Sequence, residues 1–271
     1  MTSNSNLIGQ EHKVLDHGMI RVVDVMGSDK SVVDSARISY QSGTKVLNND
    51  QGLVKYLMRN FHLSPFESAV IQFHIKMPMF VARQWSRHRM ASYNEVSARY
   101  SVLPKEFYVP TKDQLCKQCQ LNKQSKDEKL GDKDANEVIA RITKSSIDAY
   151  NEYEKLLEMG LCRELARTVL SVNFYTEIYF TSNLRNLLHF INLRNSPHAQ
   201  YEIRCYAEVL NEIVSEWCPF SHKAFNDYVV NATNLSKPAM NSVLDMLNGE
   251  EPLYEGMSKG EVREFEEKFN L

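Results

Sequence analysis

A dense group of charged and hydrogen-bonding side chains stands out in residues 83–100, RQWSRHRMASYNEVSARY, which carry four arginines and one acid, Glu95. A guanidinium offers two parallel N–H donors, and this fork matches the oxygens of a phosphate or a carboxylate. Serine and asparagine residues add neutral donors, and backbone N–H groups between Ser92 and Arg99 can form a nest for an anion. The cluster therefore predicts a site for a phosphate-bearing ligand. The alternative is a solvated loop that forms salt bridges between subunits.

A second polar set has helical spacing in residues 183–194, NLRNLLHFINLR. Arg185, His189 and Asn192 share one face, opposite a stripe of apolar residues at i, i+3, i+4 and i+7. That stripe consists of Leu184, Leu187, Leu188 and Ile191. We expect a helix whose polar face, continued by Arg194, lines the other side of a pocket. A lone histidine such as His189 is more often a surface residue than a ligand contact.

Other kinds of site lack their sequence patterns. Ser97 lies in no nucleophile elbow, and the chain has no H-E-x-x-H, Walker loop or G-x-G-x-x-G, which disfavours nucleophilic, zinc-protease and Rossmann-type sites. Arg167 has apolar neighbours in ARTVLS, where a charge must be paired or bind an anion. Cys116 and Cys119 form a C-x-x-C, but no second pair completes a ligand set. We therefore expect unpaired thiols and no metal.

The composition is that of an ordinary globular protein. The 271 residues are 43 % hydrophobic and 24 % charged, with a formal net charge of −2, enough for one substantial domain or two small ones. The negative balance, with no aromatic residues interleaved in the basic run, disfavours a non-catalytic nucleotide- or RNA-binding protein. No apolar run approaches the roughly 20 residues of a membrane helix, and the N-terminus lacks a secretory pattern. We expect a cytoplasmic protein without membrane or nucleic-acid partners.

The elements that must hold the polar clusters are mostly helical. Residues 69–77, AVIQFHIKM, alternate between apolar and polar side chains, which predicts a strand with one buried face. A strand is also expected over 19–27 and a short one over 107–110, whereas 172–181 is of mixed character and 87–100 is irregular. Helices are expected over 31–40, 51–60, 78–87, 135–159, 162–170, 183–194 and 199–217.

Two charged stretches lie outside this pattern. Residues 112–134 carry six lysines against five acids and few apolar groups, so we expect a mobile surface insertion. Residues 248–271 carry seven glutamates against three basic residues and are expected to dock loosely or not at all. The sequence thus predicts an α/β or α+β protein with a single catalytic domain over 1–235 and an acidic C-terminal extension over 236–271.

Residues 87–100 resemble the signature R-H-R-x-x-S-x-N-E-x-S-x-R-Y of the flavin-dependent thymidylate synthases at each of its nine fixed positions. Nine fixed residues in fourteen are far more specific than a short glycine motif. HLSPFE (62–67), FVARQWS (80–86) and NLRNLLHFINLRNSPHAQYEIR (183–204) are similar to further segments of that family. The resemblance extends over residues 15–110 and 135–230, and the insertion and the acidic tail fall outside it.

The resemblance implies a fold and a reaction. The fold is a curved mixed or antiparallel sheet surrounded by helices. The reaction is the reductive methylation of dUMP to dTMP, with methylenetetrahydrofolate as carbon donor, FAD as redox mediator and NADPH as hydride source. The resemblance also implies that no enzyme thiol acts as nucleophile. The assembly would be a homotetramer whose active sites are each built from several subunits.

Carried over position by position, the resemblance assigns roles to both polar clusters. The residues implied to contact FAD are Ser39, Ser64, Glu67, Arg87, His88, Arg89, Met90, Glu95, Asn183, Arg185 and His189. The residues implied to bind dUMP are Gln84, Arg87, Glu95, Val96, Ser97, Ala98, Arg99, Arg167 and Arg194. Arg194 is implied to be catalytic, because a cation against the uracil stabilises the N3-deprotonated base and makes C5 a better nucleophile. We expect the two phosphorylated ligands, rather than protein acids, to supply most of the negative charge around 87–100.

Three positions refine this assignment. The other class of thymidylate synthase uses a cysteine that follows a proline, whereas here Cys218 precedes one, in EWCPF, and is expected to pack in the interior. Ser171 stands in RTVLS where the family has a proline, and Ser64 stands for a threonine. A flavoprotein of the same fold with a different pyrimidine substrate is the alternative. The joint presence of the uracil- and phosphate-binding set argues for dUMP.

Overall fold

The computed structural model describes residues 6–38, 49–118 and 126–271, and the chain divides into two units, Met1–Tyr228 and Val229–Leu271. The first unit is built on a five-stranded antiparallel sheet with the order β1-β2-β3-β7-β4. Its strands are β1 (Glu11–Val14), β2 (Gly18–Met26), β3 (Val70–Pro78), β7 (Tyr175–Asn183) and β4 (Ser92–Glu95). The domain limits expected from the sequence stay a prediction.

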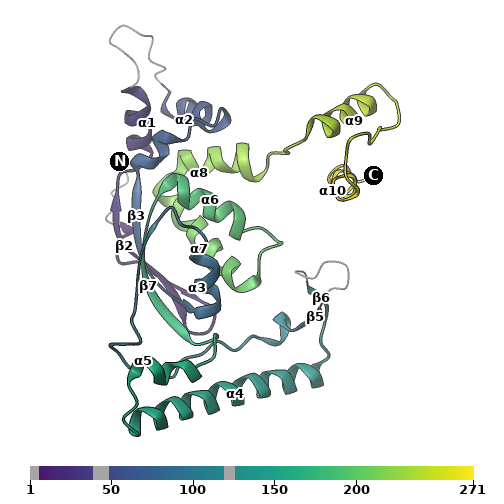
Figure 1. Cartoon of the computed structure of the whole chain (residues 1–271). Helices are drawn as coiled ribbons and strands as arrows, with labels where there is room; N and C mark the ends of the chain where they lie inside the picture. Colours follow the sequence, from purple (N-terminus) through teal and green to yellow (C-terminus); the bar gives the residue numbers. More distant parts are fainter. Residues whose placement is uncertain (1–5, 39–48, 119–125) are drawn as a thin grey trace. The chain divides into compact units, whose positions relative to one another are not determined.

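The helices of the first unit lie mainly between β2 and β3 and after β7. They are α1 (Asp29–Arg37), α2 (Asp50–Arg59), η2 (Ser64–Ser68), α3 (Met79–Trp85), η3 (Lys112–Gln114), α4 (Asp132–Glu158), α5 (Arg163–Ala166), η4 (Arg167–Val169), α6 (Leu184–Arg194), α7 (Tyr201–Trp217) and α8 (Pro219–Phe225). The long strands curve around α3, α6 and α7, as Figure 1 shows. The expected α+β fold with a curved sheet is therefore confirmed, and every strand pairing in it is antiparallel.

The period-two pattern of β3 predicts its burial correctly. Ile71, Phe73 and Ile75 are buried, and Gln72 and His74 on the alternate face are only partly buried. β3 pairs along its length with β2 and with β7, so it is the central strand. Pro78 is the N-cap of α3, a position at which its fixed φ suits the start of a helix.

Trp85, at the end of α3, is the centre of the core under the site. Its ring centroid lies 4.4 Å from that of Phe190 in α6, 5.5 Å from Phe180 in β7 and 6.1 Å from Tyr206 in α7. All four side chains are at most 1 % exposed. The core thus joins four elements, α3, α6, β7 and α7, just before the segment that begins at Arg87.

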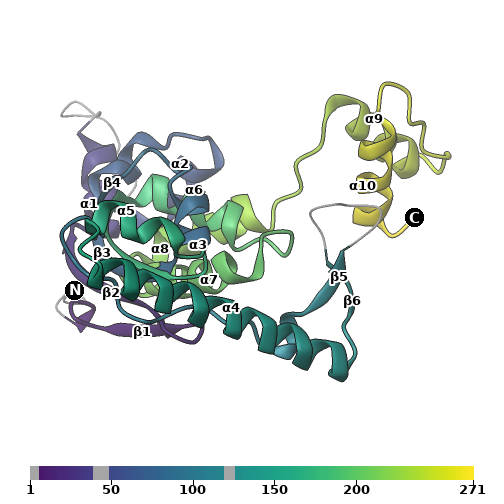
Figure 2. The ribbon, with the colours of Figure 1, turned by 60° about the horizontal axis from the view of Figure 1, so that its bottom comes forward.

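Several segments differ from the expectations. The short strand expected over 107–110 is only an isolated β-bridge between Phe107 and Phe174, and the helix expected over 162–170 is the short α5 followed by η4. Residues 92–95, expected to be irregular, form β4, which pairs with β7 at the edge of the sheet through its backbone. In the charged stretch 112–134, β5 (Cys116–Gln118) and β6 (Lys126–Lys129) pair as a hairpin near the start of α4 (Figure 2). Backbone hydrogen bonds do not need apolar side chains, so composition alone did not reveal this hairpin. Cys119 lies outside the described residues.

The second unit contains α9 (Lys237–Leu247) and α10 (Lys259–Phe269). Both helices begin at serine caps, since Ser236 accepts from the N–H of Ala239 and Ser258 from that of Glu261. The side chain of Phe265 is buried at 3 % exposure. The acidic end is therefore folded into helices. Serine caps and one apolar stripe are sufficient to form them, and the glutamates stay on the surface. In the part of the chain that the structure describes, no helix is long and apolar enough to cross a membrane.

Candidate active site

The first cavity, of about 590 Å³, lies between the segment after α3, β7 and α6. Six residues that the sequence assigns to ligands line it: Arg87, His88, Arg89, Met90, His189 and Arg194. Phe180, Phe190 and Leu193 add apolar walls. A cationic cavity with flat apolar walls suits an anionic ligand that carries an aromatic ring system.

His88 and Arg194 are in direct contact in this cavity. The Nε of Arg194 donates to Nε2 of His88 at 3.0 Å, so the proton of the neutral imidazole is on Nδ1. Burial, then the charge of Arg194, then that of His189 lower the pKa of His88 to about 4. Burial also lowers the pKa of Arg194. His88 is therefore neutral near pH 7 and can accept the hydrogen bond.

The backbone of His88 is anchored as well. The hydroxyl of Tyr93 in β4 donates to the carbonyl oxygen of His88 and, at 3.1 Å, to that of Trp85. The N–H of His88 donates to the carbonyl of Trp85 at 2.9 Å. Burial raises the pKa of Tyr93 to about 12, so the phenol keeps its proton and remains a donor.

Four further predicted flavin contacts lie where η2 meets the start of α6. Arg185 forms an ion pair with Glu67, and Asn183 caps α6 by accepting from the N–H of Asn186 at 3.0 Å. Ser64 is in the same 3-10 turn as Glu67. None of these four predicted contacts is in the lining of the first cavity. Ser39 lies outside the described residues.

The second cavity, of about 520 Å³, contains most of the predicted nucleotide set. Its lining includes Glu95, Val96, Ser97, Ala98 and Arg167 from that set, together with Arg83. After β4 the chain turns, and the carbonyl of Ser97 accepts from the N–H groups of Tyr100 at 3.0 Å and Ser101 at 3.1 Å.

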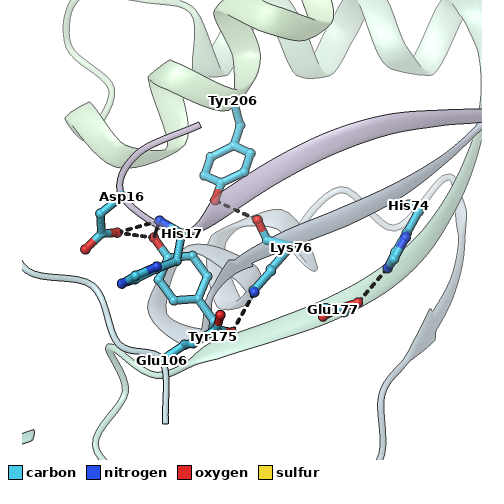
Figure 3. A network of polar contacts seen from close by, with 8 residues as sticks. All are labelled: Asp16, His17, His74, Lys76, Glu106, Tyr175, Glu177 and Tyr206. Atoms are coloured by element: carbon cyan, nitrogen blue, oxygen red, sulfur yellow. Dashed lines mark hydrogen bonds and ion pairs between the residues drawn. The ribbon is translucent and has the colours of Figure 1, made fainter. Parts of the chain in front are cut away.

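The wall of the second cavity is fixed by contacts with β7. A carboxylate oxygen of Glu95 accepts from the hydroxyl of Thr176 at 2.7 Å. The neighbouring Tyr175 donates to Asp16 at 2.5 Å (Figure 3). Burial, then the hydrogen bond to Asp16, raise the pKa of Tyr175, so it remains a donor. Asp16 also accepts from the N–H of Val109 at 3.0 Å, and so joins the first hairpin to this wall.

Further polar contacts in Figure 3 stiffen the strands behind this wall. The ammonium of Lys76 lies 2.6 Å from a carboxylate oxygen of Glu106, and the hydroxyl of Tyr206 donates to the carbonyl of Lys76 at 2.8 Å. His74 and Glu177 pair across β3 and β7 at 2.7 Å. These contacts tie β3, β7 and α7 together beside Tyr175.

The arginines of the two polar clusters fall into two groups, those paired with protein acids and those without such a partner. Arg99 pairs with Glu164 at 2.8 Å, and Arg185 pairs with Glu67, so protein acids balance these two cations. Within 87–100 only Arg99 is paired with a described acid, and the expectation that ligands supply most of the charge there stays a prediction. For Arg83, Arg87, Arg89, Arg167 and Arg194 the described residues offer no carboxylate at ion-pair distance. Arg167 is exposed, not buried, and donates to the carbonyl of Glu164 at 3.3 Å.

Two predicted nucleotide contacts, Gln84 and Arg99, line neither cavity. Sequence reasoning also missed lining residues in β7 and α6. Asn186 lies one turn before His189, so helical spacing could have indicated it, whereas nothing in the sequence links Thr176 to Glu95. Ser171 holds the turn after η4, since its hydroxyl donates to Asn173 at 2.5 Å and its carbonyl accepts from Phe174 at 3.2 Å.

The four cysteines that the structure describes lie apart from both cavities. Cys218 is fully buried, and burial raises the pKa of its thiol. Cys116, Cys162 and Cys205 are unpaired. None of the four lines either cavity. Across residues 6–38, 49–118 and 126–271, no group of three or more His, Cys, Asp or Glu side chains could hold a metal ion.

Comparisons with known proteins agree on one family. A family model described as thymidylate synthase complementing protein matches residues 21–220. A flavin-dependent thymidylate synthase of Wolbachia pipientis wMel is 48 % identical over 90 % of this chain and 86 % of that protein. The protein of the same name from Ruegeria pomeroyi is 46 % identical over 94 % of this chain and 87 % of its own.

Solved structures point the same way. A UMP/dUMP methylase, PolB, from Streptomyces cacaoi, crystallised with 5-Br UMP, superimposes with a TM-score of 0.73 at 34 % identity. The match covers 82 % of this chain and 99 % of that one. The residues matched by the family model include both cavities and the whole segment 87–100. This chain therefore belongs to the family described as thymidylate synthase complementing protein.

Proposed function

We propose that this protein is a flavin-dependent thymidylate synthase that converts dUMP to dTMP. Methylenetetrahydrofolate donates the carbon, NADPH the hydride, and FAD mediates the redox chemistry. The observation that carries the proposal is the segment 87–100, which has all nine signature residues and contributes to both cavities. Arg87, His88, Arg89 and Met90 line the first cavity, and Glu95, Val96, Ser97 and Ala98 line the second, which supports a flavin role for the first group and a nucleotide role for the second. The protein would work in the cytoplasm.

The first cavity fits FAD. Three guanidinium groups, from Arg87, Arg89 and Arg194, line it without any acidic residue among its described lining. The forks of Arg87 and Arg89 suit the two phosphates of the cofactor, which leaves Arg194 for the uracil. Phe180, Phe190 and Leu193 supply an apolar wall beside the flat heterocycle. When bound there, FAD would pass reducing equivalents from NADPH to the transferred one-carbon unit.

The predicted dUMP contacts are divided between the two cavities, which supports an active site shared between subunits. Arg87 and Arg194 line the first cavity, whereas Ser97 and Arg167 line the second. We infer that residues from different subunits complete one dUMP site, in a homotetramer. At both cavities, some arginines have no carboxylate partner among the described residues. These cations would pair with the phosphate groups of dUMP and FAD.

Within the site, Arg194 would carry the activation of uracil. Arg194 is partly buried, and a cation in a partly desolvated place stabilises developing negative charge more strongly than in water. Neutral His88 accepts a hydrogen bond from the Nε of Arg194, and the other guanidinium N–H groups remain available for the base. The buried Cys218 thiol keeps its proton and lines neither cavity, which supports activation of the uracil without a thiolate at C6.

The test is direct. Protein purified with FAD should show the absorption bands of an oxidised flavin, bleach with NADPH and form dTMP from dUMP and methylenetetrahydrofolate. Protein that takes up no FAD, or that forms no dTMP with all three reactants present, would refute the proposal. The thymidylate product should be quantified by chromatography, because NADPH can bleach a flavin without any transfer of carbon.

Methylation of UMP is the second candidate, favoured by the similarity to the UMP/dUMP methylase of Streptomyces cacaoi. The same assay with UMP in place of dUMP decides between them. We expect the kcat/KM for dUMP to exceed that for UMP. The opposite order would replace dUMP by UMP as the substrate.

A further inference from the structure

A buried carboxylate lies behind one of the predicted nucleotide contacts. Glu202, in the first turn of α7, is only 7 % exposed. No Lys or Arg among the described residues pairs with it; its two oxygens instead accept from neutral donors. Tyr108 donates to Oε1 at 3.1 Å and Gln200 donates to Oε2 at 2.8 Å. The N-terminal end of α7 further favours a negative charge there.

Gln200 links Glu202 to a further hydrogen-bonding side chain. It occupies the N-cap position of α7 but makes no capping hydrogen bond with its side chain. Its amide nitrogen faces Glu202, so its Oε1 faces the opposite way and accepts from Nε2 of Gln84 at 2.6 Å. Three side chains, from α7, its N-cap and α3, thus form one chain of hydrogen bonds that ends at Gln84.

An ionised carboxylate only accepts hydrogen bonds, whereas an amide both donates and accepts. The charge of Glu202 therefore fixes which end of Gln200 faces it, and Gln200 in turn fixes Gln84. The arrangement leaves Oε1 of Gln84 available as an acceptor. Tyr108 cannot reverse the chain, because burial and the charge of Glu202 raise the pKa of its phenol and keep it a donor.

The far end of the chain is rigid. Tyr108 is 6 % exposed, and its N–H and carbonyl are both bonded to Asn173, at 2.9 Å each. Its ring packs against Phe80, in the same helix as Gln84, at 5.9 Å between centroids. A glutamine in place of Glu202 would fill the same space, so the feature that only the carboxylate provides is a fixed direction of hydrogen bonding.

We propose that Glu202 is a positioning residue that, through Gln200, makes Gln84 present its carbonyl oxygen to a hydrogen-bond donor of the nucleotide. This inference rests on the proposed function, in which Gln84 contacts dUMP. The donors that dUMP offers are the N3–H of uracil and the 3′-hydroxyl of the sugar. In Glu202→Gln, the chain can run in either direction, and Gln84 would turn its amide nitrogen to the ligand for part of the time.

The experiment compares dUMP affinity in the FAD-loaded enzyme for wild type, Glu202→Gln and Glu208→Gln. Glu208 is an exposed acid on the same helix, paired with Arg204, and provides the matched control. We expect Glu202→Gln to weaken dUMP binding about three- to tenfold, the loss of one hydrogen bond, with FAD affinity and melting temperature equal to the control. Affinity equal to the control, or a loss matched by FAD release and unfolding, would overturn the proposal.

A second comparison tests whether the effect passes through Gln84. In a Gln84→Ala background, Glu202→Gln should weaken dUMP binding by less than about twofold, because coupled residues are not additive. Repeated weakening in that background would overturn the proposal. Wild-type enzyme that forms no dTMP would instead refute the function itself, and this inference with it.

Two nucleotide analogues identify the donor. If Gln84 accepts from the sugar, the effect of Glu202→Gln should vanish for 2′,3′-dideoxyuridine monophosphate. If it accepts from the base, the effect should vanish for N3-methyl-dUMP. An effect that persists undiminished with both analogues would overturn the assignment of Oε1 as an acceptor for the nucleotide.

Discussion

Arg194 Nε lies 3.0 Å from His88 Nε2, so the predicted catalytic cation rests against a neutral imidazole that comes from 106 residues earlier in the chain. His88 belongs to the signature segment and Arg194 to the end of α6. The contact joins the two polar clusters of the sequence into one cavity. It also means that the imidazole must stay unprotonated for the guanidinium to remain in this position.

The first prediction concerns the guanidinium itself. Arg194→Ala should slow dTMP formation at saturating substrate by about 100-fold or more, the usual effect of removing one donor that stabilises developing charge. Bound FAD, measured by its visible absorption, should stay at the wild-type level. Arg141→Ala, on the exposed face of α4, is the matched control and should leave both unchanged. Turnover that survives Arg194→Ala would rule out its role in uracil activation.

The second prediction concerns pH. Because the pKa of His88 falls from 6.5 in the unfolded chain to about 4, the unfolded state binds more protons between these values. Stability of the flavin-free protein should therefore fall as the pH drops from about 7 to about 4. In His88→Gln, whose amide oxygen can still accept from Arg194, this fall should be smaller. Melting temperatures across this pH range provide the measurement.

The control for that series is His222→Gln. Burial lowers the pKa of His222 as well, so it contributes a slope of the same sign from outside the cavity. Only the His88 variant should also change the pH profile of turnover. Equal pH profiles of stability in wild type and His88→Gln would contradict the neutral state assigned to this imidazole.

The third prediction separates binding from nucleophilic chemistry at Ser97. The Oγ of Ser97 accepts from the N–H of Arg99 at 3.3 Å, and Ser97 lines the second cavity. Ser97→Ala should raise the KM for dUMP by about two- to tenfold, the effect of one hydrogen bond, and leave substantial turnover. Ser215→Ala, on the exposed face of α7, is the control. Loss of all turnover with intact dUMP affinity would indicate a serine nucleophile instead.

Periodicity predicted the elements whose buried faces are continuous. The stripe of Leu184, Leu187 and Leu188 is buried as expected, and so are the alternate residues of β3. β4 and the β5–β6 hairpin could not be predicted in this way, because both are polar and are held by backbone pairing. The partner of β4 is also distant in the chain, and apolar spacing does not encode such a pairing.

The site was predictable only as far as the family resemblance identified residues. The resemblance named Glu95 and Arg194 but could not show that they line different cavities. Nor could it reveal Glu164, which balances Arg99 from a helix 65 positions away in the chain, or Glu202 behind Gln84. Each of these partners depends on how the strands and helices pack, and no local pattern encodes it.

The fourth prediction tests independence from thiols. Cys218 is 0 % exposed and its thiol pKa is raised by burial and then by Asp29, so it cannot supply a thiolate near neutral pH. Cys218→Ala should keep turnover within about twofold of wild type, with a loss of about 1 kcal/mol of stability for the missing sulfur. If dTMP formation were abolished while FAD stayed bound and the protein stayed folded, a mechanism without an enzyme thiol would be contradicted.

The fifth prediction concerns Gly18, where β2 passes under α7. A Cβ there would lie 2.0 Å from the hydroxyl of Tyr206 and 2.6 Å from the carbonyl oxygen of Val14. Tyr206 is fully buried and donates to the carbonyl of Lys76, and the Val14 oxygen belongs to the β1–β2 pairing, so neither atom can move without loss of a contact. Gly18→Ala should therefore destabilise the protein by about 1–3 kcal/mol. Thermal unfolding of the FAD-loaded protein measures the loss as a lower melting temperature.

Two variants sharpen this last test. Gly131→Ala is the matched control, because a Cβ at Gly131 would meet no atom within 4 Å and its φ of −64° is ordinary for alanine. Adding Tyr206→Phe to Gly18→Ala removes the closest clash but keeps the one with Val14, so stability should recover only in part. Melting of Gly18→Ala within about a degree of the Gly131→Ala control would show that β1 and β2 can separate at this corner without loss, against the close approach described for Gly18.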